Sequence, residues 1–339
     1  DNGSVSINGS GVSTTGGTIT LNAGSTDGDI SISSGAPISA SGAVSFVTST
    51  DGSVSIGADV TSTGSSISVS GGGAAESISI SATSTVDANT SVNLNAGTID
   101  NNGTVNGGTT VTLTAALLDN SGSVTGGTGV TANSTTVTND GSITATTGTL
   151  QLNASTVNNN AGGLLQASAG NVNFEAPGAL TVNLGAGSNI NAFGAGNDVS
   201  FNPATSGAIT IAGAGDGNIS AADQVILNGG AGAVLANLNQ VTGTITGSGA
   251  GFSVTTDTGS LTANTVTSTG AVVLNAIGGG LTASNVSTNT GNVNLTAGNG
   301  SMTATNISNT SAAGTTSLLV SAGGDLTANN VTGNGAVSL

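Results

Sequence analysis

The stretch Leu261-Thr262-Ala263-Asn264-Thr265-Val266 decides the fold, because close copies of it begin at Leu281, Met302 and Leu326. The four first residues are spaced by 20, 21 and 24 positions, and each copy keeps a second apolar residue five positions later. These second residues are Val266, Val286, Ile307 and Val331. A third apolar position follows as the pairs Val272 and Leu274, Val293 and Leu295, and Val337 and Leu339. Apolar positions that return at one long period predict a repeat architecture.

The N-terminal part of the chain has the same organisation, in which pairs of apolar residues are separated by one polar residue. Alternation with a period of two predicts β-strands that place apolar side chains on one face and Ser or Thr on the other. The enrichment in β-branched residues agrees with strands, and no segment has a sustained helical period. The pairs are Val5 and Ile7, Ile30 and Ile32, Val54 and Ile56, and Ile78 and Ile80.

Short strands at a fixed long period are typical of a solenoid, in which each strand pairs with its equivalent one coil away. A β-sandwich is the alternative, but a sandwich has no reason to keep three apolar positions in register at every turn. We therefore expect an all-β, parallel β-helix with coils of about 20 residues, each built of three short strands. Residues 1–339 are expected to form a single continuous solenoid, either as a segment of a longer protein or as a unit that stacks.

The middle of the chain carries the most specific phrase, in which an apolar residue is followed by Asp, Asn and Gly. The phrase occurs at 99–105, at 118–124 and, with the order Thr-Asn-Asp-Gly, at 137–143. Together with residues 261–264 and 323–328, it resembles the haemagglutinin repeats of filamentous-haemagglutinin-type, two-partner-secreted bacterial adhesins. The resemblance implies a right-handed parallel β-helix that is exported to the bacterial cell surface.

The composition excludes several classes of function. The chain has no Lys, Arg, His or Cys and a formal net charge of −16, so it offers no basic patch to nucleic acid. An anionic membrane surface repels it, and no apolar run approaches the roughly 18 residues needed for membrane insertion. Ser, Thr and Asp without His cannot build a conventional catalytic triad, and no Trp or Tyr is present to stack on a sugar. We expect a protein that is not an enzyme.

Alignment of the three phrases places Asn101, Asn120 and Asn139 at one position in consecutive coils. Stacked Asn side chains can hydrogen-bond along the axis, each amide donating to the next carbonyl. The favoured interpretation is a structural asparagine ladder, and a binding role is the alternative.

The same alignment places the carboxylates of Asp100 and Asp119 on adjacent coils. Like charges about 5 Å apart repel by about 1 kcal/mol in bulk water, and a bound divalent cation such as Ca²⁺ would relieve this, with Asp140 as a further oxygen ligand. Solvated turn carboxylates are the alternative. Residues 194–199 also resemble the calcium-binding nonapeptide of repeat toxins, which needs successive copies, and residues 213–217 are the one loose second copy. No other cofactor is expected.

These patterns predict an extracellular structural protein, the stiff shaft of a bacterial surface fibre or adhesin, either secreted or held at the cell surface. One alternative is a filament subunit that stacks on itself head to tail through uncapped solenoid ends. Another is a surface-binding solenoid for ice or cations, with Thr18, Thr20 and residues 110–114 as T-x-T candidates. The expected partners are the chain itself or a ligand on a host or cell surface. Asn-x-Ser/Thr triplets are numerous, but this composition produces them by chance.

Overall fold

The structure is a computed structural model that describes residues 3–24, 26–73, 75–203, 207–320 and 324–338. Within these ranges it contains 36 strands and no helix. The parallel coils recur at a spacing of about 21 residues and number about 15. The all-β solenoid predicted from the sequence is therefore confirmed. Gly323 and Leu339, which belong to the repeat phrases named above, lie outside the described residues.

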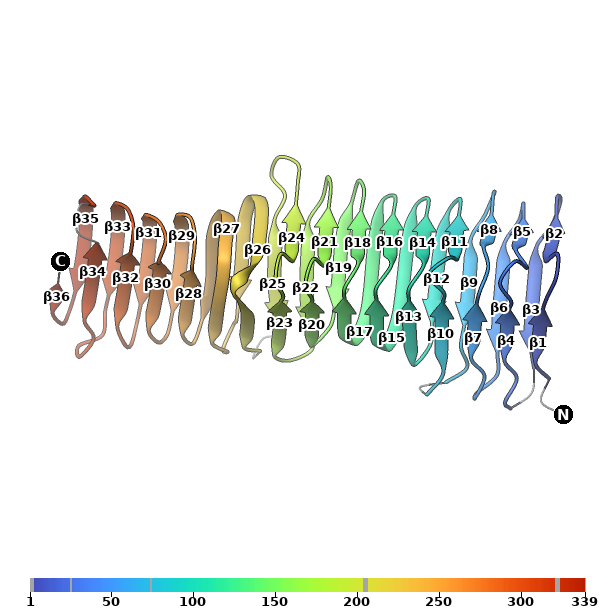
Figure 1. The fold of residues 1–339 in the computed structure, drawn as a ribbon. Helices are drawn as coiled ribbons and strands as arrows, with labels where there is room; N and C mark the ends of the chain where they lie inside the picture. The colour runs from blue at the N-terminus through green and yellow to red at the C-terminus, as the bar shows by residue number, and fades with distance from the viewer. Residues whose placement is uncertain (1–2, 25, 74, 204–206, 321–323, 339) are drawn as a thin grey trace. The chain divides into compact units, whose positions relative to one another are not determined.

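The chain divides into two compact units, called unit 1 and unit 2 below. Unit 1 comprises residues 1–158 and 163–170, and unit 2 comprises residues 159–162 and 171–339. Within each unit, consecutive coils lie side by side with their strands pointing the same way (Figure 1). A single continuous solenoid over residues 1–339 stays a prediction.

Each coil of unit 1 contributes strands to three parallel ladders, as the sequence predicts. The first ladder contains β1 (Val5–Ile7), β4 (Ile30–Ile32), β7 (Val54–Ile56), β10 (Ser77–Ile80), β13 (Thr98–Asn101) and the second halves of β15 (Thr110–Asn120) and β17 (Gly129–Asn139). The second contains β2 (Val12–Thr14), β5 (Ile38–Ala40), β8 (Val60–Ser62), β11 (Thr85–Ala88), β14 (Thr104–Gly107), β16 (Ser123–Gly126), β18 (Ser142–Ala145) and β21 (Leu164–Ala167). The third contains β3 (Ile19–Ala23), β6 (Val44–Thr48), β9 (Ile67–Ser70), β12 (Ser91–Asn95), the first halves of β15 and β17, and β19 (Thr149–Asn153).

Unit 2, described by itself, also has parallel pairing, and it contains the longest strands, β26 (Ile209–Asn228) and β27 (Val234–Gly249). After β20 (Thr156–Asn159), where the two units divide in sequence, come β22 (Val172–Ala176), β23 (Leu180–Leu184), β24 (Asn189–Ala192), β25 (Val199–Pro203), β26 and β27. The remaining strands are β28 (Phe252–Thr256), β29 (Leu261–Ser268), β30 (Val272–Ala276), β31 (Leu281–Thr288), β32 (Val293–Ala297), β33 (Met302–Asn309), β34 (Thr316–Val320), β35 (Leu326–Gly333) and β36 (Val337–Ser338).

The core of unit 1 consists of columns of equivalent side chains. Alternation along each strand turns every second residue inward, so the register that pairs the backbones also stacks the apolar side chains. The first ladder shows this as one buried column: Ile30, Val54, Ile78, Ile99, Leu118 and Val137.

The predicted register of unit 2 is confirmed by its strand pairs. Leu261 pairs with Leu281, and Val266 pairs with Val286, which in turn pairs with Ile307. These residues are buried, but Val331, the next in the column, is only partly buried. The recurring apolar position of Val331 predicts the same buried column, and its partial exposure differs from this because, within the described residues, a coil packs on one side of it only.

The coils that begin at β29 differ from the prediction of three separate strands. The first two apolar positions of each coil lie in one strand that bends between them, as in β31 from Leu281 to Val286. At the bend, Asn285, Asn306 and Asn330 have φ angles of 52°, 52° and 54°. This left-handed backbone conformation costs Asn less than most residues, so each Asn turns the strand without ending it.

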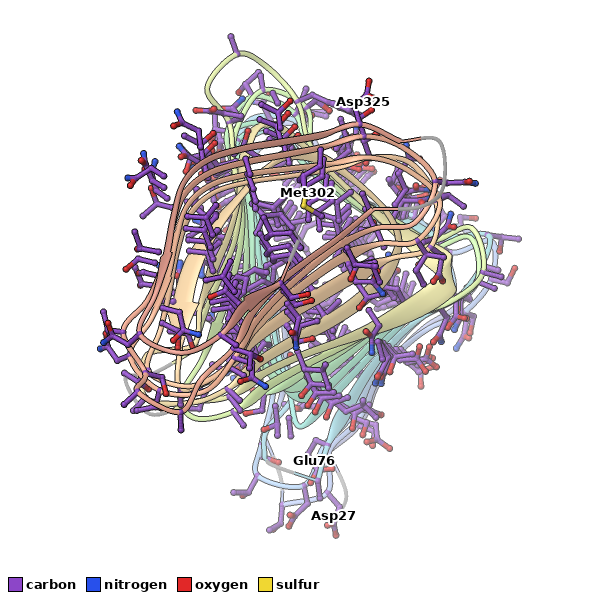
Figure 2. All side chains as sticks on the ribbon, turned by 90° about the vertical axis from the view of Figure 1, so that its left-hand side faces the viewer. Asp27, Glu76, Met302 and Asp325 are labelled. Carbon is purple, nitrogen blue, oxygen red and sulfur yellow. The ribbon has the colours of Figure 1, made fainter. Side chains whose placement is uncertain are left out.

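Aromatic side chains occupy the same interior. The rings of Phe174 and Phe201, from paired strands of unit 2, stack with centroids 4.6 Å apart and planes 9° apart. Phe193 is the exception, with 43% of its surface exposed. Figure 2 shows the same division in the last coils of unit 2, where Met302 points inward and Asp325 points outward. Within the described residues, the interior of each unit is therefore mainly apolar.

We expect the change Val286→Asp to destabilise the fold by several kcal/mol, because it places an unpaired carboxylate in the apolar column. The matched control is Thr282→Asp, on an exposed residue of the same strand, which should change the unfolding free energy little. Urea unfolding followed by circular dichroism measures both. Equal effects from the two variants would contradict the assigned register.

Candidate functional site

The candidate site lies in unit 1, where three strands of the first ladder end in the Asp-Asn-Gly phrases. In β13 the alternation turns Ile99 inward, Asp100 outward and Asn101 inward again. Asn101, Asn120 and Asn139 are each the last residue of the first-ladder stretch, and each is at most 1% exposed. The phrase therefore buries an amide at the corner between two ladders and leaves a carboxylate outside.

The buried amides form a hydrogen-bonded ladder along the stack. Nδ2 of Asn101 donates to Oδ1 of Asn120 at 2.7 Å, and Nδ2 of Asn120 donates to Oδ1 of Asn139 at 2.7 Å. Nδ2 of Asn120 also donates to the carbonyls of Gly122 (3.3 Å) and Ser142 (3.1 Å). These carbonyls fix the orientation of the amide, because a flipped side chain would turn its oxygen toward two other acceptors.

The ladder has a defined beginning. Oδ1 of Asn101 is buried without a hydrogen-bond partner, because its register partner in the preceding coil is Ile80, which has no donor. At the other side, Nδ2 of Asn139 donates to the carbonyls of Gly141 and Leu164, each at 3.2 Å. The unpaired acceptor at Asn101 carries a desolvation cost that the rest of the ladder avoids.

The glycine of each phrase is required by the close approach of successive coils. A Cβ atom on Gly122 would lie 1.9 Å from the carbonyl oxygen of Gly103, and one on Gly141 would lie 1.9 Å from that of Gly122. No side chain fits at either position without moving the backbone. The recurring Gly of the phrase is the sequence signal for this role, which the apolar pattern alone does not predict.

The carboxylates lie outside the same corner. Asp100 and Asp119 are register partners on adjacent strands, and the next partner in the row is Thr138. Burial raises the pKa of the Asp119 carboxyl above its ordinary value of 3.8, and repulsion from Asp100 and Asp140 raises it further. Asp100 also accepts a hydrogen bond of 2.7 Å from Nδ2 of Asn102.

The arrangement offers a cation few ligands. Among the residues that the structure describes, no group of three or more acidic, His or Cys side chains is placed to hold a metal ion. The Ca²⁺ site at Asp100, Asp119 and Asp140 stays a prediction.

In residues 194–199, which resemble the calcium-binding nonapeptide, the Asp198 carboxylate accepts the backbone N–H of Gln224 at 3.0 Å. The side chains of residues 214–216, within the weaker second copy, lie outside the described part of the chain.

Several acidic residues accept backbone hydrogen bonds from the next coil. Asp29 and Asp59 stand directly before strands, and each carboxylate accepts the backbone N–H at the equivalent corner of the following coil: Ser53 at 2.8 Å and Thr85 at 2.9 Å. Asn171 and Asn292 do the same with their side-chain oxygens. The apolar pattern does not predict these corner contacts, although the place of each Asp or Asn directly before a strand is a sequence signal for them.

The threonines proposed for surface recognition do not form an extended array. Thr112 has Thr131 as its partner on one side but Asn93 on the other. Thr20 has Ser45 as its partner. A groove of about 330 Å³ in unit 2 is lined by Gly, Ser, Thr and Asn and contains no titratable side chain.

Comparison of the chain with family models, with curated proteins and with solved structures gives no match. Within the described residues, no helix is long and apolar enough to cross a membrane. The likeness to haemagglutinin repeats therefore rests on the sequence phrases and on the parallel solenoid.

We expect Asn120→Ala to lower the unfolding free energy by about 1–3 kcal/mol, because it removes the buried hydrogen bonds that Asn120 accepts from Asn101 and donates to Asn139. Asn93→Ala is the matched control, since Asn93 is exposed on a neighbouring strand. Denaturant unfolding of both variants measures the difference. A loss no larger for Asn120→Ala than for the control would show that the ladder adds no stability.

We expect Asp119→Asn to stabilise the protein at neutral pH. A raised pKa means that the folded chain binds the Asp119 proton more tightly than the unfolded chain. Stability conferred by this group therefore falls as the pH rises from 3.8 through the raised folded value, and the penalty persists above that value. The variant removes the penalty, so its melting temperature should exceed that of the unchanged chain at pH 7 and the difference should vanish in acid.

Calcium provides the second arm of the same experiment. If a Ca²⁺ ion binds between the carboxylates, a concentration ten times its dissociation constant stabilises the unchanged chain by about 1.4 kcal/mol, and chelator reverses the gain. Asp119→Asn should lose this response, whereas Asp223→Asn, an exposed change in unit 2, should keep it. An unchanged melting temperature with calcium would mean that water alone screens these carboxylates.

Proposed function

We propose that this chain is a non-enzymatic structural segment, the shaft of an extracellular bacterial surface fibre or adhesin, which spaces or displays another part of the assembly. The observation that carries the proposal is the repetition of one arrangement within each unit: parallel backbone pairing over stacked apolar columns. A repeat that contacts only its neighbours provides length and stiffness in proportion to the number of coils.

The side-chain contacts between coils support a load-bearing role. The amide ladder from Asn101 to Asn139 and the corner carboxylates of Asp29 and Asp59 all join one coil to the next. These contacts add to the backbone ladder at corners, where the strand pairing stops. A pull along the stack of a unit is thus shared between strands and corners.

The chemistry of the surface supports a role without catalysis. The chain has no Lys, Arg or His, so a carboxylate has no basic side chain with which to share a proton relay. The absence of Lys and Arg also leaves trypsin no bond to cleave, which suits a protein exposed outside the cell. The phrases at 99–105 and 118–124, which resemble haemagglutinin repeats, favour a bacterial surface location and a host or cell-surface ligand for the assembly.

Removal of one whole coil tests this proposal. Deletion of residues 261–280 joins residue 260 to Leu281, the register partner of Leu261, so every later strand keeps its partner type. We expect the shortened chain to fold, to reach the cell surface and to support attachment of the cells. Deletion of residues 261–270 breaks the register and should abolish folding.

Circular dichroism, antibody labelling of intact cells and an attachment assay provide the three measurements. A shaft tolerates the loss of one coil, with all three readouts retained. A whole-coil deletion that folds and is displayed but no longer supports attachment would contradict the proposal, because that coil would then carry a site of its own.

A further inference from the structure

Three exposed asparagines in unit 2 share an unusual backbone conformation. Asn285, Asn306 and Asn330 stand at the bends of β31, β33 and β35, and among the described residues they are the non-glycine residues with positive φ. All three side chains are exposed. The bend turns each of them outward, while the residue that follows, such as Val286, points into the core.

These asparagines form a second ladder, on the surface. Nδ2 of Asn285 donates to Oδ1 of Asn264 at 3.1 Å, and Nδ2 of Asn306 donates to Oδ1 of Asn285 at 3.0 Å. Nδ2 of Asn330 donates to Oδ1 of Asn306 at 2.8 Å. An Asn amide carries two N–H bonds. The ladder uses one of them, and the exposure of the side chain leaves the other facing solvent.

Each of these residues also begins an Asn-x-Ser/Thr triplet: Asn285-Val286-Ser287, Asn306-Ile307-Ser308 and Asn330-Val331-Thr332. Triplets of this kind arise by chance in this composition, so the sequence alone does not distinguish them. In the structure, these three are set apart by the positive φ of their outward bend and by the amide hydrogen bonds that join them, and their side chains are exposed. The hydroxyl residues at the third position are register partners of one another.

We propose that Asn285, Asn306 and Asn330 are acceptor sites for N-linked glycosylation. In this step Nδ2 forms a bond to the anomeric carbon of a sugar that is activated as a phosphate ester. The bond between that carbon and the phosphate oxygen breaks, the phosphate leaving group takes the electron pair, and a basic group of the transferring enzyme accepts the proton that the amide loses. A glycosyltransferase supplies the catalysis, and the chain supplies the acceptor.

The product is compatible with the fold. A glycosylated Asn is a secondary amide that retains one N–H, so the hydrogen bond from Asn306 to Asn285 survives the modification. Asn309, three residues further on, begins the triplet Asn309-Thr310-Ser311 and is the opposite case. It is 2% exposed, and its Nδ2 donates to the carbonyls of Gly291 (3.3 Å) and Thr315 (3.1 Å). A sugar on Asn309 would have to leave the core or break these contacts.

The inference goes beyond the proposed shaft function and does not depend on it, because acceptor geometry is a property of the bends themselves. Sugars at these positions would lie in a row along one edge of unit 2. They would add large polar groups to a surface whose side chains are otherwise mainly Ser, Thr and Asn.

Mass spectrometry of the protein isolated from the cells that make it tests the proposal. Pepsin is the suitable protease, because the chain has no Lys or Arg for trypsin. We expect sugar adducts on peptides that contain Asn285, Asn306 or Asn330 and none on Asn309. Asn264 is the internal control, since it belongs to the ladder but is followed by Thr265 and Val266 and so begins no triplet.

The variant Ser308→Ala separates acceptor chemistry from structure. It removes the triplet hydroxyl but leaves the Asn306 amide in its ladder, so the adduct on Asn306 should disappear while the adducts on the other two sites and the melting temperature stay unchanged. An intact mass equal to that of the bare sequence would overturn the proposal. Adducts on Asn309, or on Asn306 in Ser308→Ala, would overturn it as well.

Discussion

The structure depends on the parallel backbone pairing of each coil with the next. A single coil of about 21 residues cannot bury its own apolar face, so stability arises only when neighbours stack. Pairing in register provides hydrogen bonds for the backbone N–H and C=O groups. It also stacks equivalent apolar side chains of neighbouring coils in the core. The close approach of coils at Gly122 and the amide hydrogen bonds of Asn120 both depend on the spacing that this pairing sets.

The corners are where that pairing is hardest to maintain, because the backbone turns and leaves polar groups without strand partners. The chain solves this in different ways at different corners. Gly122 lets two backbones approach, Asn120 fills a corner with its own hydrogen bonds, and Asp59 accepts an N–H of the following coil. Asn306 turns a strand by adopting a conformation that most residues avoid.

The sequence was sufficient for the fold because apolar periodicity and burial have one cause in a solenoid. The spacing of Leu261, Leu281 and Met302 predicts their pairing directly. The bends at Asn285 and Asn306 could not be predicted, since Asn is equally common in ordinary turns. The missing hydrogen bond at Oδ1 of Asn101 could not be predicted either, because it depends on which residue of the preceding coil pairs with Asn101.

The amide ladder of unit 1 gives one corner a net dipole along the stack of coils. Backbone hydrogen bonds between coils run both ways, as from Val5 to Asp29 and from Ser33 back to Ile7, so their dipoles largely cancel. The side-chain amides from Asn101 to Asn139 all point their nitrogen the same way, and their dipoles add. The column therefore carries a net dipole along the stack, with its negative end at the unpaired Oδ1 of Asn101.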